Sequence, residues 1–174
     1  MDTSPAPWRR CSVSLYRAGV PKRSAGLLLY RMENGRIEVL IAHMGGPFWA
    51  RKNEGAWSIP KGEYDDDEDP LAAATREFGE ELGMAPPDGT PVKLGEVRQS
   101  GGKVVTAYAL EGDVDLAAFH SNTFVVEWPR NSGKQREFPE VDRVEWVDLE
   151  TAATLLVKGQ VPFLDGLRHH VQSL

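Results

Sequence analysis

Seven residues at fixed separations in the segment 62–84 constrain this 174-residue chain more than any other feature of its sequence. The segment reads Gly-x5-Glu-x7-Arg-Glu-Phe-x-Glu-Glu-x-Gly-Met, which places four glutamates, one arginine and two glycines in one short stretch. Seven fixed identities occur by chance with a probability on the order of 10⁻⁹ per starting position. The spacing therefore indicates a functional constraint, and this segment is called the 62–84 motif below.

The second half of the 62–84 motif predicts a helix of roughly a dozen residues. Asp69 can act as its N-cap, Pro70 suits its first position, and Gly83 follows as a C-terminal stop. At about 100° per residue, one face of this helix carries an apolar stripe made of Leu71, Ala74, Phe78 and Leu82.

The glutamates of this helix fall on the face beside the apolar stripe. Glu77, Glu80 and Glu81 lie together there, and the upstream position is Ala73, which is too small to obstruct a bound group. Glu77 and Glu81 are four residues apart, so their charges repel, and Arg76 offsets only part of this repulsion. Clustered carboxylates suit Mg²⁺ or Mn²⁺, which takes its remaining ligands from water and substrate phosphates. We therefore expect phosphate-directed hydrolysis.

The complete pattern resembles the motif of the Nudix hydrolases, in which the helix glutamates hold metals that bridge a diphosphate while water attacks phosphorus. The resemblance extends from about residue 24 to the end of the chain. It implies an α/β protein with the Nudix fold, a mixed β-sheet sandwiched between α-helices. It also implies that Mg²⁺ or Mn²⁺ is the cofactor.

The same resemblance implies roles for single residues. Gly62, Glu77, Glu80 and Glu81 would form the metal site, with Glu77 and Glu81 as the principal ligands and Glu80 as a further ligand or the base. Arg76 would orient the carboxylate of Glu77. On the helical wheel Glu68 points nearly opposite to Glu77, so we interpret it as a residue that precedes the helix and braces the loop.

Composition and charge limit the kind of protein. A chain with 41% hydrophobic residues is expected to form one compact domain at 23–174, preceded by an extension at 1–22 that contains the single cysteine, Cys11. Without a signal-peptide pattern or a disulfide, we expect a cytoplasmic protein with no membrane partner. The net charge of −6 argues against nucleic acid but permits a small nucleotide substrate. A homodimer remains open.

Periodicity and turn residues predict the other elements. A short strand is expected near 12–16, and the turn Asn34-Gly35 should join two strands in a hairpin. The segment 45–55 reads as a loop. The expected sheet strands are 25–30, 37–43, 57–59, 92–98, 104–110, 124–128 and 143–147. Asp148 should cap a helix that continues to about residue 157, and 161–171 should form a last helix.

Candidates for substrate binding lie outside the motif's glutamates. Lys61 stands in Trp-x-x-Pro-Lys-Gly, a form that resembles Nudix enzymes acting on dinucleoside polyphosphates. It could neutralise one phosphate of a long chain or be an ordinary solvent-exposed lysine. The segment 130–136 is basic; Lys134 and Arg136 could cradle a distal phosphate or be charges on a solvated hairpin loop. Each alternative remains open from sequence alone.

Aromatic residues and one later glutamate complete the candidate set. Phe48, Trp49 and Tyr64 could stack on a nucleobase or pack as ordinary loop residues, and Arg51 is a nearby phosphate candidate. Many Nudix enzymes have a glutamate late in the chain as a metal ligand or base. Glu140 would take this role here, with Glu127 as a competitor and an ordinary surface glutamate as the alternative. The four histidines show no triad or metal spacing, and we interpret them as structural or solvent-facing.

The expected function is Mg²⁺-dependent hydrolysis of a nucleoside diphosphate linked to another moiety. A dinucleoside polyphosphate such as diadenosine tetraphosphate is the leading substrate. The alternatives are, in order, a nucleoside triphosphate pyrophosphohydrolase of the 8-oxo-dGTP type, an ADP-ribose pyrophosphatase, and a nucleotide-binding regulator without catalysis. The last of these usually has a degraded motif, whereas every defining position is present here.

Overall fold

The structure, a computed structural model, describes residues 21–174. The strand expected near 12–16, Cys11 and most of the expected extension at 1–22 lie outside the described residues. Among the residues that are described, no helix combines the length and the apolar character needed to span a bilayer.

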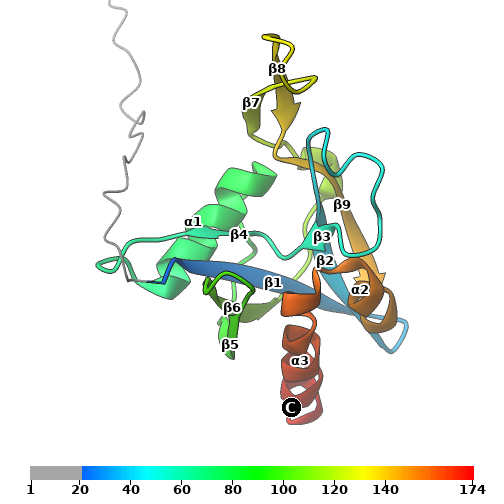
Figure 1. The fold of residues 1–174 in the computed structure, drawn as a ribbon. Helices are drawn as coiled ribbons and strands as arrows, with labels where there is room; N and C mark the ends of the chain where they lie inside the picture. Colours follow the sequence, from blue (N-terminus) through cyan, green and yellow to red (C-terminus); the bar gives the residue numbers. More distant parts are fainter. Residues whose placement is uncertain (1–20) are drawn as a thin grey trace, which may run out of the picture.

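A seven-stranded mixed sheet forms the centre of the domain (Figure 1). Its main path runs in the order β3 (Trp57–Ser58), β2 (Arg36–Met44), β1 (Arg23–Glu33), β6 (Val104–Glu111) and β5 (Val92–Arg98). Two further strands pair off this path, β4 (Lys61–Glu63) with β1 and β9 (Val141–Asp148) with β2. The pairing of β1 with β6 is parallel, and the other pairings are antiparallel.

Three α-helices cover the two faces of this sheet. Buried residues of α1 (Pro70–Leu82) pack in one cluster, while α2 (Leu149–Leu155) and α3 (Pro162–Gln172) pack in the other. β1 divides its side chains accordingly: Leu27 and Leu29 join the α1 cluster and Leu28 the opposite one, all with no exposed surface. A strand covered on both faces reads as a continuous apolar run. The expected sheet between helices is confirmed.

Local signals in the sequence account for most element boundaries. Asn34 and Gly35 have φ values of 50° and 76°, as a tight hairpin turn requires, and they join β1 to β2. Asp69 accepts a hydrogen bond from the backbone N–H of Ala72, and Gly83 ends α1 with a φ of 67°. Asp148 caps α2 through Thr151 in the same way. Two short 3₁₀ helices, η1 (Leu116–Ala118) and η2 (Lys158–Gln160), complete the chain.

One strand does not lie where the sequence analysis places it. The expected strand 124–128 was assigned to the central sheet, but β7 (Thr123–Glu127) pairs with β8 (Gln135–Pro139) in a separate two-stranded hairpin. This hairpin, called the arm below, stands out from the body in Figure 1. β7 pairs with β8, the next strand in the sequence, because closing the short loop between them costs little entropy. The place beside β2 in the central sheet is occupied by β9. Val125 of the arm is 62% exposed.

Candidate metal centre and active site

The first glycine of the 62–84 motif lies directly beneath a motif glutamate. A Cβ atom built on Gly62 of β4 would be 2.0 Å from the carboxyl carbon of Glu77 on α1. No side chain fits at that distance, so a glycine is a steric requirement for the observed position of Glu77. The spacing between glycine and glutamate in sequence thus reflects a close approach between a strand and a helix.

Arg76 gathers three motif carboxylates around its guanidinium group. Its Nε donates to Oε1 of Glu68 at 3.0 Å, and its Nη1 donates to Oε1 of Glu77 at 2.6 Å and to Oε2 of Glu80 at 3.2 Å. The hydrogen bond to Glu68 is the main reason that the pKa of Arg76 is raised. Glu68 precedes α1, so this contact links the segment before the helix to a side chain within it.

Glu81 is the most perturbed carboxyl group of the motif. Its Oε2 accepts a hydrogen bond from the backbone N–H of Lys61 at 3.1 Å. Burial raises the pKa of Glu81 to about 7, although the Lys61 charge opposes this shift. Burial also raises the pKa of Glu77 and lowers the pKa of the Lys61 ammonium group. The site therefore holds carboxylates whose ionisation is costly without a cation.

Glu140 approaches this cluster from a different part of the chain. It lies between β8 and β9, where its backbone carbonyl accepts from the N–H of Gly45 at 2.8 Å and its own N–H donates to the carbonyl of Asn122 at 2.8 Å. Partial burial raises the pKa of Glu140, and the charge of Glu80 adds to the shift. The charge of Glu140 in turn raises the pKa of Glu81. Glu140 therefore lies close enough to Glu80 and Glu81 of the motif helix for their charges to act on one another.

The donor chemistry fits a hard divalent cation. Glu77, Glu81 and Glu140 offer oxygen ligands, and burial together with the charge of neighbouring carboxylates raises the pKa of each. A cation offsets that cost, because its carboxylate ligands bind in the ionised form. Within residues 21–174, no three acidic, histidine or cysteine side chains already stand at coordinating distance from a common point. Arg76 instead holds Glu77 and Glu80.

Two predictions about the motif helix need correction. Ala73 was expected on the open carboxylate face, but it has no exposed surface and packs in the cluster beneath α1, because the helix lies directly on the sheet. Leu71, expected in the buried stripe, is only half-buried at the start of the helix. The other stripe residues, Ala74, Phe78 and Leu82, are fully buried.

The aromatic candidates fall into different environments. Trp49 is half-buried against the core beneath α2 and α3, with the ammonium group of Lys52 5.0 Å from its ring centroid. Tyr64 packs against the cluster beneath α1. Phe48 is 41% exposed and meets Trp128 of the arm. Only Phe48 of these three therefore offers substantial ring surface to a ligand.

The basic candidates lie on surface elements. Arg51 is exposed in the loop between β2 and β3, whereas Lys61 is half-buried beside Glu81. Lys134 lies in the turn of the arm, and Arg136 lies in β8 opposite Val126. The structure thus brings Lys61 to the carboxylates and places Lys134 and Arg136 on the arm.

The sequence analysis did not select two residues that shape this region. Trp128 follows β7 immediately before the basic loop, and that adjacency was the available signal. His43 was interpreted as structural, and it is fully buried, with Nδ1 2.6 Å from Oδ1 of Asp142 and Nε2 2.7 Å from the carbonyl of Lys52. It ties β2 to β9 and to the 45–55 loop, close to Glu140.

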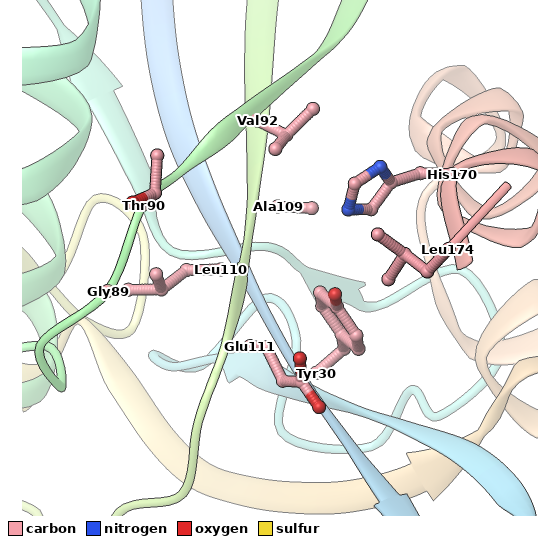
Figure 2. Close-up of a pocket in the computed structure, with 9 residues that line it drawn as sticks. All are labelled: Tyr30, Gly89, Thr90, Val92, Ala109, Leu110, Glu111, His170 and Leu174. Atoms are coloured by element: carbon pink, nitrogen blue, oxygen red, sulfur yellow. The ribbon is translucent and has the colours of Figure 1, made fainter.

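A separate pocket of about 420 Å³ lies between β5, β6 and the end of α3 (Figure 2). Its lining includes Tyr30, Val92, Glu111 and His170, whose ring meets that of Tyr30 edge-on at 6.3 Å. None of its lining residues belongs to the 62–84 motif. The candidate active site is therefore the carboxylate cluster and not this pocket.

We predict that Gly45→Ala displaces Glu140 and destabilises the protein. A Cβ atom at position 45 would lie 2.0 Å from the carbonyl oxygen of Pro139, a backbone atom that cannot rotate away. The free energy of unfolding should fall by about 1–3 kcal/mol, as for other overpacked sites. Thermal unfolding measures the change, and an unchanged melting temperature would contradict it.

A family model and several solved structures match this chain. A family model described as the NUDIX domain matches residues 20–167. A structure of a C. elegans Ap4A hydrolase binary complex superposes with a TM-score of 0.58 at 22% identity, covering 88% of this chain and 99% of that one. The NUDIX domain of Shewanella oneidensis NrtR complexed with ADP ribose gives 0.59 at 17% identity, covering 87% and 89%.

A third similar structure is a Nudix hydrolase from M. smegmatis, RenU, with a TM-score of 0.52 at 24% identity, covering 87% of this chain and 86% of that one. At these identities the likeness concerns the fold. A search of curated proteins found no match.

Proposed function

Because this chain belongs to the NUDIX family, we propose that its carboxylate cluster catalyses the metal-dependent hydrolysis of a nucleoside diphosphate linked to another moiety, most specifically of a dinucleoside polyphosphate. The observation that carries this proposal is that Glu77 and Glu140 both lie close enough to Glu81 for their charges to raise its pKa, and that burial raises the pKa of all three. Clusters of perturbed carboxyl groups are typical of catalytic sites.

In this proposal the residues of the cluster have separate roles. Glu77, Glu80 and Glu81, with Gly62, would hold Mg²⁺ or Mn²⁺. When bound, the cation polarises phosphoryl oxygens and lowers the pKa of the attacking water. Arg76 keeps the Glu77 carboxylate in place through its 2.6 Å hydrogen bond. Glu140, Glu80 or Glu77 then accepts the proton of the water.

Three features support a dinucleoside polyphosphate as the substrate. Lys61 lies beside Glu81 and can meet one phosphate of a long chain. The arm carries the basic residues Arg130, Lys134 and Arg136 in addition. A dinucleoside polyphosphate presents several phosphates that such residues can bind. A solved structure of similar fold is an Ap4A hydrolase. These features together favour a long phosphate chain over a short one.

Product analysis tests this proposal. Wild-type protein with Mg²⁺ should convert diadenosine tetraphosphate and one water into ATP and AMP, and chelation with EDTA should stop the reaction. The panel also contains 8-oxo-dGTP, unmodified dNTPs and ADP-ribose, with products separated by chromatography.

Each result on this panel has a defined meaning. Preferential conversion of 8-oxo-dGTP to its monophosphate would replace the proposal with nucleotide-pool sanitation, and preferential cleavage of ADP-ribose would replace it with an ADP-ribose pyrophosphatase. Binding of one of these nucleotides without any turnover would indicate a regulatory module.

A further inference from the structure

A cluster of two aromatic rings and one guanidinium group joins the arm to the 45–55 loop. The rings of Phe48 and Trp128 meet edge-to-face with centroids 5.4 Å apart. The guanidinium carbon of Arg130 lies 4.8 Å from the centroid of Phe48. We call these three residues the arm cluster. Phe48 and Arg130 are exposed and Trp128 is half-buried, so the cluster presents a surface to solvent.

Close backbone packing connects the arm cluster to the carboxylate site. Gly46 has a φ of 90°, and a Cβ atom there would lie 2.7 Å from Cζ of Phe124, so the arm packs directly on the loop. The preceding residue, Gly45, donates its N–H to the carbonyl of Glu140. The loop that carries Phe48 is therefore held against both the arm and the candidate catalytic glutamate.

The distance between the two sites can be bounded from chain geometry. Phe48 follows Gly45 by three residues, which reach at most about 11 Å. Along the arm, the six residues from Lys134 to Glu140 span about 20 Å at the rise of an antiparallel strand. The reach of the chain therefore places the arm cluster within about 20 Å of the backbone of Glu140. A phosphate chain can bridge a separation within this limit between the reacting phosphorus and a group bound at the cluster.

Residues 128–136, around the turn of the arm, carry three basic side chains and no acidic one, while the strands of the arm also carry Glu127 and Glu137. Arg130, Lys134 and Arg136 carry positive charge on a chain whose net charge is −6. Among the ion pairs formed by residues 21–174, none involves these three side chains. A guanidinium group that lies over a ring keeps its N–H edge for phosphate while its other face can stack on a base.

We propose that Phe48, Trp128 and Arg130 bind the second, non-reacting nucleoside of a dinucleoside polyphosphate, with its base stacked on the cluster and its proximal phosphate contacting Arg130. This inference rests on the proposed function. Stacking on rings and guanidinium planes is tolerant of base identity, so the cluster recognises a nucleoside and not a particular base. The arm thus selects for substrates with a nucleoside at both ends.

Two substrates with the same number of phosphates separate this role from general electrostatics. Diadenosine tetraphosphate carries two nucleosides, whereas adenosine 5′-tetraphosphate carries one. In Phe48→Ala and in Arg130→Ala, KM for the dinucleotide should rise about 10-fold with kcat unchanged, since each removes a stacking surface. KM for adenosine 5′-tetraphosphate should stay at its wild-type value in Phe48→Ala. In Arg130→Ala, which also loses the phosphate contact, it should rise less than KM for the dinucleotide.

Matched variants control for the substitutions themselves. Val125→Ala alters an exposed apolar side chain of the same arm, and Arg168→Ala removes an exposed arginine from α3; neither should change KM for either substrate. The melting temperature of each variant should stay within about 2 °C of the wild-type value, which corresponds to a stability change of at most about 1 kcal/mol. Such agreement would show that the folds are intact.

The outcomes distinguish the inference from the function on which it rests. An equal rise in KM for both tetraphosphates, or no rise for either, would overturn the nucleoside site while the proposed function stands. If wild-type protein fails to hydrolyse the dinucleotide at all, the proposed function is overturned, and the nucleoside site with it.

Discussion

Glu81→Gln is expected to abolish metal-dependent turnover and, at the same time, to make the metal-free protein more stable at pH 8. Loss of a metal-ligating carboxylate should reduce kcat/KM by roughly 10³-fold or more. The amide of glutamine can still accept the hydrogen bond from the backbone N–H of Lys61, so folding should be retained. An ordinary structural glutamate would not combine these two effects.

The stabilisation follows from the direction of the pKa shift. Burial raises the pKa of Glu81 to about 7 in the folded protein, from 4.5 for the ordinary group. Between these values the folded state binds more protons than the unfolded state, so the free energy of unfolding falls as pH rises. At pH 8 the loss amounts to about 3 kcal/mol, and Glu81→Gln removes it. At pH 4 the two proteins should differ little.

Thermal unfolding at pH 4 and pH 8 in EDTA measures this prediction, alongside kcat/KM with Mg²⁺. Added Mg²⁺ should raise the melting temperature of wild type at pH 8 but not that of the variant, because ligand binding stabilises only a site that can bind it. Glu54→Gln, in an exposed loop, is the matched control and should change neither quantity. A variant less stable than wild type at pH 8, or turnover within tenfold of wild type, would contradict the role of Glu81.

Gly62→Ala is expected to lower kcat/KM by about 10²–10³-fold with the fold retained, which is the range seen when one preorganised catalytic group is displaced. The added Cβ would lie 2.0 Å from the carboxyl carbon of Glu77, the far end of a side chain that can rotate away. Such a rotation breaks the 2.6 Å hydrogen bond to Arg76 and removes Glu77 from the cluster. Steady-state kinetics measures the loss.

Gly79→Ala provides a control within the same motif. A Cβ atom there meets only the carbonyl oxygen of Met84, at 3.9 Å, and position 79 lies inside α1. Alanine should stabilise the helix by up to about 1 kcal/mol and leave kcat/KM unchanged. Equal activity losses in Gly62→Ala and Gly79→Ala would contradict this prediction, because the loss would then not depend on the contact between position 62 and Glu77.

Local sequence signals were enough to predict most elements of this fold. The caps Asp69 and Asp148, the stop at Gly83 and the Asn34-Gly35 turn each act within a few residues, and each appears in the structure as expected. The strands β4 and β8 were missed. β4 has three residues and β8 is largely exposed, so neither carries a strong apolar alternation.

Which strands pair with each other was harder to predict than which segments form strands. The strand at 124–128 has the same local pattern whether it extends the central sheet or pairs with its neighbour. The long ladder between β2 and β9 decides the matter, because it occupies that place in the sheet. A contact between residues about a hundred positions apart has no local signal in the sequence.

In the candidate site, too, some features follow from local sequence and others from the packing of the whole chain. The sequence by itself determined the family, the motif helix and the identities of Gly62, Arg76, Glu77 and Glu81, because their spacing obeys helix geometry and one close glycine contact. Only the tertiary structure decided that Glu140 lies close enough to Glu81 for their charges to interact, that Ala73 is buried, and that Phe48 meets Trp128 and Arg130. Helical spacing is encoded within a few residues, whereas burial and encounters between distant segments depend on how the whole chain packs.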